Sequence, residues 1–174
     1  MKKLPVLISL LVAVSITLAA TALAAGNDPL NSSDKSFVQS AYEDGLAEIH
    51  FAGLGIEKTA NPELKAFAEK LEAEHGKTIG ELRTLAQSKN VSVPSSVGFA
   101  DKSKEMILDA KSGGSFDKSF IDTIVKDHQK AIDSFEKEAS DAKDPDVKAY
   151  ATKTLTALKA RLATAQELQQ KLGK

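Results

Sequence analysis

The sequence contains no cysteine and no tryptophan, and aromatic residues make up only 5% of its 174 residues. The absence of cysteine excludes disulfides, thiolate metal sites and a cysteine nucleophile. Glycine and proline are scarce, with 10 and 5 copies, which disfavours a β-sandwich or a β-barrel. The 23 basic and 24 acidic side chains nearly balance, so no positive excess favours nucleic-acid binding.

Hydrophobic residues make up 42% of the chain and charged residues 27%. These proportions are typical of a globular protein rather than a disordered one, and the length suits one domain. With few aromatic, glycine and proline residues, the composition favours helices rich in Ala, Leu, Lys and Glu.

The N-terminus has the three-part pattern of a secretory signal peptide. Two lysines precede an apolar run from Leu4 to Ala24, which ends in the small-residue motif Ala22-Leu23-Ala24. The pattern predicts a cleaved signal peptide over residues 1–24 and a secreted protein, periplasmic if the host has an outer membrane. No membrane insertion is then expected after cleavage. An uncleaved anchor is the alternative, since about 20 apolar residues can just span a bilayer.

After a polar lead over residues 25–33, four long stretches show the spacing of core-facing helices. They cover about residues 34–58, 61–90, 116–143 and 145–172. Ser33 and Ser115 are the expected caps of the first and third helices. Proline follows Asn61 and Asp144, which is the start signal expected for the other two.

Residues 91–115 form the connection between the second and third long helices. This stretch contains Pro94 and the pair Gly113-Gly114, and a short helix is predicted over residues 101–111. Met106, Ile107 and Leu108 are expected to pack that helix onto the rest of the domain. No stretch alternates with the period of a β-strand, so residues 34–172 are predicted to form an all-α domain.

Two segments of the chain resemble each other. Residues 61–71 (NPELKAFAEKL) and residues 144–154 (DPDVKAYATKT) share a helix start and a Lys-Ala-aromatic-Ala run. The echo indicates two helical hairpins of common design joined by a long crossover, which is the arrangement of a ferritin-like four-helix bundle. Chance recurrence of common helix-start signals is the alternative interpretation.

Ionisable side chains lie on or beside the apolar stripe near the middle of each long helix. They are Glu48 in the first helix, Glu74 and His75 in the second, Asp127 and His128 in the third, and Arg161 in the fourth. Antiparallel pairing brings all six to one level of the bundle. Burying such groups costs several kcal/mol each unless they are paired or coordinated, so this layer requires an explanation.

Two explanations remain open. Glu48, Glu74, His75, Asp127 and His128 could bind a single divalent transition-metal ion (Fe, Mn, Zn or Cu), with Arg161 as a charge partner. Alternatively, Arg161 forms ion pairs with the carboxylates, and the layer is a network of protein side chains alone in a structural or stress-related interaction protein. A homo-oligomer or a periplasmic protein is the expected kind of partner.

A dinuclear oxidase site is disfavoured. Such a site needs two Glu-x-x-His motifs, and only Glu72 with His75 matches, since Val125 occupies the second glutamate position. No nucleophile–base pair or phosphate loop stands out, so the sequence favours a binding protein over an enzyme. His50 points away from its apolar stripe and is expected at the surface.

The residues from Phe37 to His75, with the motifs Asn61-Pro-Glu-Leu-Lys-Ala-Phe-Ala and Glu74-His75, resemble the bacterial secreted domain-of-unknown-function family 4142. Asp127-His128 and the region from Asp144 to Leu155 carry the same resemblance, which covers about residues 34–170. It implies a ferritin-like bundle outside the cytoplasm and no settled activity.

The resemblance also implies which residues form the polar layer. Family members usually have a glutamate matching Glu48 and acid-His pairs matching Glu74-His75 and Asp127-His128. In the last helix they commonly have a histidine three residues after a leucine. This chain has Leu158 and Arg161 at those positions, and an arginine there can neutralise carboxylates but cannot ligate a metal.

Overall fold

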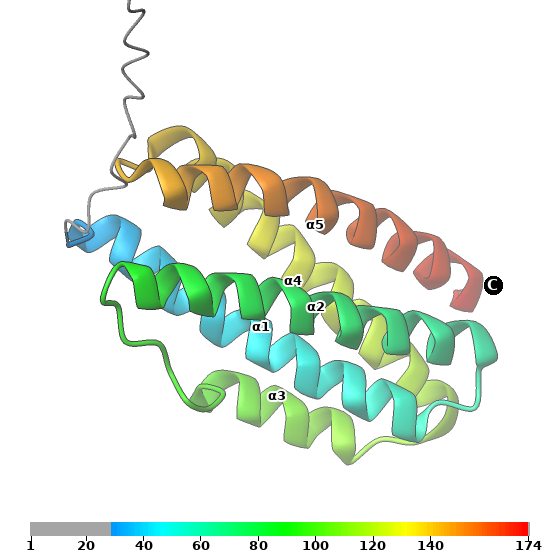
Figure 1. The fold of residues 1–174 in the computed structure, drawn as a ribbon. Helices are drawn as coiled ribbons and strands as arrows, with labels where there is room; N and C mark the ends of the chain where they lie inside the picture. Colours follow the sequence, from blue (N-terminus) through cyan, green and yellow to red (C-terminus); the bar gives the residue numbers. More distant parts are fainter. Residues whose placement is uncertain (1–28, 174) are drawn as a thin grey trace, which may run out of the picture.

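The computed structural model describes residues 29–173, and all regular secondary structure in this range is helical. Five helices follow one another along the chain (Figure 1), and the predicted all-α fold is confirmed. They are α1 (Ser32–Lys58), α2 (Pro62–Ser88), α3 (Phe99–Asp109), α4 (Gly113–Asp141) and α5 (Pro145–Leu172). The predicted signal peptide over residues 1–24 lies outside the described residues.

The four long helices pack as two hairpins. α1 packs along α2, and α4 packs along α5, while α1 contacts α4 and α2 contacts α5 between the hairpins. The short helix α3 belongs to the crossover and lies against α1 and α4 (Figure 1). Among residues 29–173, none of the helices combines the length and the apolar composition that a membrane span requires.

Both proline-containing helix starts form as the sequence predicts. The Asn61 side chain accepts a hydrogen bond from the Glu63 amide at 2.9 Å, and Asp144 accepts one from the Asp146 amide at 2.9 Å. In each case proline occupies the first helical position, where no amide hydrogen is needed. These starts fix the tight turns within the two hairpins.

The other two long helices begin earlier than expected. Asn31, rather than Ser33, caps α1 and accepts a hydrogen bond from the Ser33 amide at 2.8 Å, since asparagine is at least as good a cap as serine. α4 begins at Gly113, which has a φ of 54°. Glycine adopts this left-handed conformation without strain, so Ser115 lies inside the first turn instead of capping it.

The short helix packs through one side chain, not three. Leu108 is buried, whereas Met106 is 73% exposed and Ile107 is 62% exposed. The expectation that all three pack was wrong because consecutive helical residues point about 100° apart, so three in a row cannot face one surface. α3 therefore covers the bundle lightly and leaves part of its apolar side in solvent.

The bundle core consists of two apolar clusters. One includes Phe51, Leu71 and Phe120, and the other includes Tyr42, Ile79 and Phe135. Along α2 the row Leu71, His75, Ile79 passes from one cluster to the other, so His75 lies at the boundary between them. Part of the predicted polar layer, namely Glu48, His75, His128 and Arg161, therefore lies in the interior.

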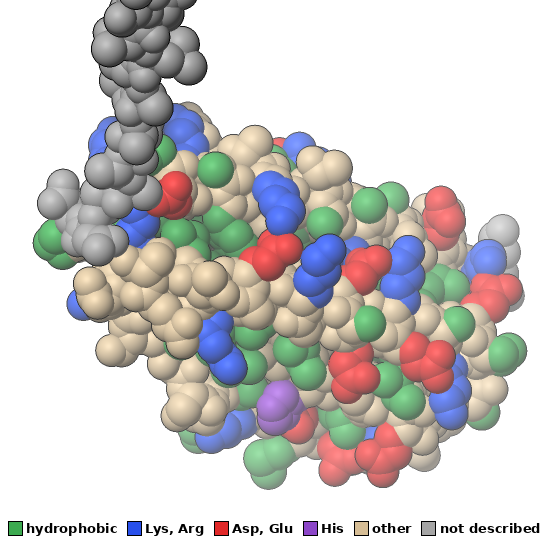
Figure 2. All heavy atoms as spheres, viewed as in Figure 1, with side chains coloured by type: hydrophobic (Ala, Val, Ile, Leu, Met, Phe, Trp, Pro, Cys, Tyr) green, Lys and Arg blue, Asp and Glu red, His purple; other side chains and the backbone are tan. Residues whose placement is uncertain are grey.

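The outer face over α2 and α5 is charged and mixed in sign. Figure 2 shows Lys/Arg and Asp/Glu side chains interspersed over this face. Ion pairs between Lys153 and Glu81 at 2.8 Å, and between Lys171 and Glu63 at 2.6 Å, join α5 to α2. These exposed pairs contribute little to stability individually.

Candidate metal centre

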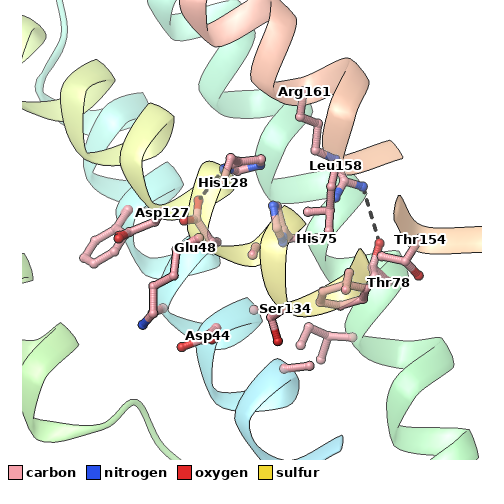
Figure 3. Close-up of a pocket in the computed structure, with 18 of the residues that line it drawn as sticks. Asp44, Glu48, His75, Thr78, Asp127, His128, Ser134, Thr154, Leu158 and Arg161 are labelled. Carbon is pink, nitrogen blue, oxygen red and sulfur yellow. Dashed lines mark hydrogen bonds and ion pairs between the residues drawn. The ribbon is translucent and has the colours of Figure 1, made fainter. Parts of the chain in front are cut away.

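Three of the predicted residues meet inside the bundle. Glu48 comes from α1, His75 from α2 and His128 from α4. One potential ligand atom of each lies within 4.8 Å of the other two. Figure 3 shows the three side chains directed toward one another from their separate helices. All three are buried, with His128 only 1% exposed and Glu48 6% exposed.

Helical periodicity places both histidines inside. His75 lies one turn from Leu71 and one turn from Ile79, while His128 lies one turn from Ile124 and one turn from Ile132. Because residues four apart share a helix face, each imidazole continues an apolar row into the core. The two rings lie 5.5 Å apart between centroids and at 90° to each other.

The hydrogen bond of His128 leaves the lone pair of its Nε2 free for a ligand. His128 Nδ1 donates a hydrogen bond to the Ile124 carbonyl at 3.0 Å, which makes Nε2 the unprotonated nitrogen of the neutral ring. His128 Nε2, His75 Nε2 and Glu48 Oε2 are all buried without a hydrogen-bond partner among residues 29–173. Buried polar atoms without a hydrogen-bond partner cost stability, and each of the three residues contributes one.

Burial controls the charges of this group. It lowers the pKa of the His128 imidazole to about 4, and the positive charge of Arg161 lowers it as well. Burial, followed by Arg161 and His128, also holds the pKa of His75 well below its usual range. Burial raises the pKa of Glu48 well above normal, with a further contribution from Asp127. Both histidines are therefore neutral at pH 7, which is the form that ligates metals.

The three side chains line a cavity of about 60 Å³. Since one water needs about 10–15 Å³ of such space, the cavity has room for an ion and a small additional ligand. Its wall also includes Phe51, Leu158 and Arg161, and its lining extends to the exposed residues Asp44 and Lys130. The cavity thus connects the buried atoms to the surface between α1 and α4.

Two predicted ligands belong to ion pairs instead. The Glu74 side chain is 37% exposed, and its Oε2 accepts a hydrogen bond from Arg161 Nε at 2.8 Å. Both Asp127 carboxylate oxygens lie 3.0 Å from Lys104 Nζ. Neither carboxylate joins the group formed by Glu48, His75 and His128. Each acid precedes its histidine by one residue, so it points about 100° away from the buried imidazole.

Two contacts of the layer were not predicted from the sequence. Lys104 reaches Asp127 from α3, and Thr78 Oγ1 accepts a hydrogen bond from Arg161 Nη2 at 3.3 Å. The second contact carries a sequence signal, because Thr78 lies on the same α2 face as His75. The first carries none, since the packing of the short helix could not be deduced. His50 lies at the surface as predicted, with its Nδ1 3.3 Å from Glu105.

A comparison of the sequence with known families decides which family it represents. The profile of the domain of unknown function DUF4142 matches residues 19–168. The chain belongs to DUF4142. A sequence comparison of this DUF4142 chain with curated proteins gave no match.

Solved structures share the fold at low sequence identity. A DUF305 fragment from Deinococcus radiodurans aligns with a TM-score of 0.74 and 12% identity, over 82% of this DUF4142 chain and 99% of the fragment. CopM in its Cu(II)-bound form aligns with a TM-score of 0.68 and 19% identity, over 79% of this chain and 96% of CopM. CopM in its Cu(I)-bound form gives 0.66 and 21%, with the same coverage. These likenesses establish a shared fold.

Proposed function

We propose that this protein binds one divalent transition-metal ion between Glu48, His75 and His128. Two observations carry the proposal: one ligand atom of each of these buried side chains lies within 4.8 Å of the other two, and each side chain has a buried nitrogen or oxygen without a hydrogen-bond partner in the described part of the chain. Two imidazoles and a carboxylate suit Cu(II), Zn(II) and Fe(II) better than Mg(II) or Ca(II). Copper-bound CopM, which has the same fold, supports copper as the first ion to test.

The proposed compartment is outside the cytoplasm. The signal-peptide pattern of residues 1–24 supports this part of the proposal. Mass spectrometry of the protein recovered from its native host should give a chain that begins at Ala25. A chain that retains Met1 or starts elsewhere within the apolar run would contradict the proposed cleavage.

Metal content of the purified protein tests the site directly. After loading with Cu(II) or Zn(II) and removal of the excess, we expect about one ion per chain by elemental analysis. At a free ion concentration of about 100 times Kd, binding should stabilise the folded state by about 2.7 kcal/mol, seen as a higher melting temperature. Since the raised pKa of Glu48 favours its protonated form, binding should also release protons.

Matched histidine variants show whether the ion binds at this centre. The double variant His75→Ala plus His128→Ala should lose both the ion and the thermal shift. His50→Ala is the control, because it removes a half-exposed histidine that is paired with Glu105 at the surface. Wild-type protein that stays metal-free, with an unchanged melting temperature in Fe, Mn, Zn and Cu, would overturn the proposal.

One set of contacts favours a second candidate, a protein-only polar layer in a structural protein. Arg161 links α5 to α2 through Glu74 and Thr78, without any ion. If the layer only fixes helix register, Arg161→Leu should destabilise the fold by about 2–3 kcal/mol, and metals should not bind. A variant stability within about 0.5 kcal/mol of the wild type, measured by urea unfolding, would exclude this candidate.

A further inference from the structure

The guanidinium of Arg161 is only partly satisfied by the protein. Its Nε donates to Glu74 Oε2 at 2.8 Å and its Nη2 donates to Thr78 Oγ1 at 3.3 Å. Both acceptors belong to α2, so the Nε–Nη2 edge of the planar group faces that helix. The third nitrogen, Nη1, is buried and finds no hydrogen-bond partner in residues 29–173. A charged donor left unpaired in the interior is costly.

Arg161 borders the same cavity as the three ligand side chains (Figure 3). A site that binds only a metal cation does not explain why the Arg161 guanidinium lines the same cavity. An arginine cannot ligate the ion and would repel it.

Arg161 and a bound divalent ion would both present positive charge to the interior of the cavity. A small anion between them would be attracted by both.

Coordination chemistry leaves a position for that anion. Three protein ligands at a tetrahedral ion leave the fourth position open for a water or another small ligand. We propose that a small monovalent anion binds at this fourth position and accepts a hydrogen bond from Arg161 Nη1. This inference rests on the proposed metal site. The cavity of about 60 Å³ restricts the anion to the size of chloride, formate or azide.

Azide is the probe, because its complex with Cu(II) has a charge-transfer absorption band. The Cu(II)-loaded protein is titrated with sodium azide at constant ionic strength, and the band gives an apparent Kd. We expect Arg161→Met to raise this Kd about tenfold or more, since it removes a charge-assisted hydrogen bond. Arg161→Lys keeps the charge but loses the planar donor, and its Kd should lie between those of the wild type and Arg161→Met.

The control is Lys153→Met. Lys153 also lies on α5 and pairs with an acid of α2, Glu81 at 2.8 Å, but it does not line the cavity. Its azide Kd should stay within about twofold of the wild type, because exposed pairs contribute little. Circular dichroism establishes that each variant is folded, and Arg161→Lys carries the test if Arg161→Met is not.

Copper content is measured on each sample before azide is added. Wild-type protein without copper overturns the proposed metal site, and the anion site with it. Wild-type protein with copper but without an azide band overturns the anion site alone. An azide Kd unchanged by both Arg161 variants does the same, because the fourth ligand is then held without Arg161.

Discussion

Two groups of buried polar residues lie in the same bundle, and they differ in how fully they are paired. At the end where α1 begins, Asp34 Oδ2 accepts hydrogen bonds from the Asp144 amide at 2.7 Å and the Lys143 amide at 3.1 Å. Beside it, Lys89 Nζ lies 2.8 Å from Asp144 and 2.7 Å from Asp146. This end cluster joins the start of α1, the end of α2 and the turn before α5.

In the central group of Glu48, His75 and His128, by contrast, an oxygen or nitrogen of each side chain is buried without a hydrogen-bond partner in the described structure. The contact between Glu48 Oε2 and His128 Nδ1 is long, at 3.8 Å. Asp34 and Lys89 of the end cluster bind neighbouring segments of the chain through hydrogen bonds and ion pairs. Each side chain of the central group has one polar atom that makes no hydrogen bond to the described residues. A buried polar group is therefore informative about ligand binding when its own protein leaves it unpaired, and not merely when it is buried.

Lowering the pH should produce the largest effect on stability, and this effect comes from His128 in the central group. An unfolded histidine binds a proton near pH 6.5, whereas His128 in the folded protein does so only at about pH 4. Between these values the unfolded state holds more protons, so stability falls as the pH falls. In metal-free protein, His128 should lose about 3 kcal/mol of stabilisation between pH 6.5 and pH 4.

Urea unfolding at a series of pH values measures this loss. His128→Leu should flatten the profile over that range, and comparison with the wild type cancels the contributions of the other titrating groups. Glu48 acts in the opposite direction, because its raised pKa makes its contribution decline as the pH rises above about 4.5. Equal slopes for His128→Leu and the wild type would be inconsistent with a buried, neutral His128.

The end cluster should be the more sensitive to truncation. Asp34→Ala leaves the Lys143 and Asp144 amides without their acceptor and should lower the free energy of unfolding by about 2–3 kcal/mol. Asp141→Ala is the control, since Asp141 is exposed and its ion pair with Lys137, at 3.4 Å, lies at the surface. It should change stability by less than about 0.5 kcal/mol, measured by chemical denaturation. Similar effects of Asp34→Ala and Asp141→Ala on stability would contradict a structural role of the end cluster.

Replacing a polar residue of the central group should stabilise the fold, whereas Asp34→Ala destabilises it. In metal-free protein, Glu48→Leu removes a buried carboxyl whose Oε2 has no hydrogen-bond partner in the described structure, and it should raise the free energy of unfolding by about 1 kcal/mol, while it abolishes metal binding. Glu48→Gln keeps the polar group and should gain less. A loss of stability in Glu48→Leu would show that Glu48 has a structural partner, as in the protein-only alternative.

Much of the fold could be predicted because local signals and hydrophobic spacing agree. Asn61 and Asp144 start their helices where the sequence indicates. The starts at Ser32 and Gly113 were misplaced because several good caps lie next to one another, and only tertiary packing selects among them. The orientation of α3 was wrong because three adjacent apolar residues define no face.

The site was predicted in outline rather than in detail. Helical spacing identified the layer and its two histidines. It could not decide which member of each acid-His pair faces inward, because neighbours on a helix lie about 100° apart and both flank the apolar stripe. The cation partners of Glu74 and Asp127 come from other helices, and such contacts depend on packing that one sequence does not reveal.

The ligand atoms come from both hairpins, since Glu48 and His75 belong to the first and His128 to the second. In a protein without cysteine, an ion held there would act as a removable crosslink between positions about 50 residues apart. Binding of the ion would link the two hairpins, and release of the ion would remove that link. The concentration of metal would then determine how readily the hairpins separate. Amide hydrogen exchange where α1 contacts α4 should accordingly be slower in the metal-bound protein than in the metal-free protein.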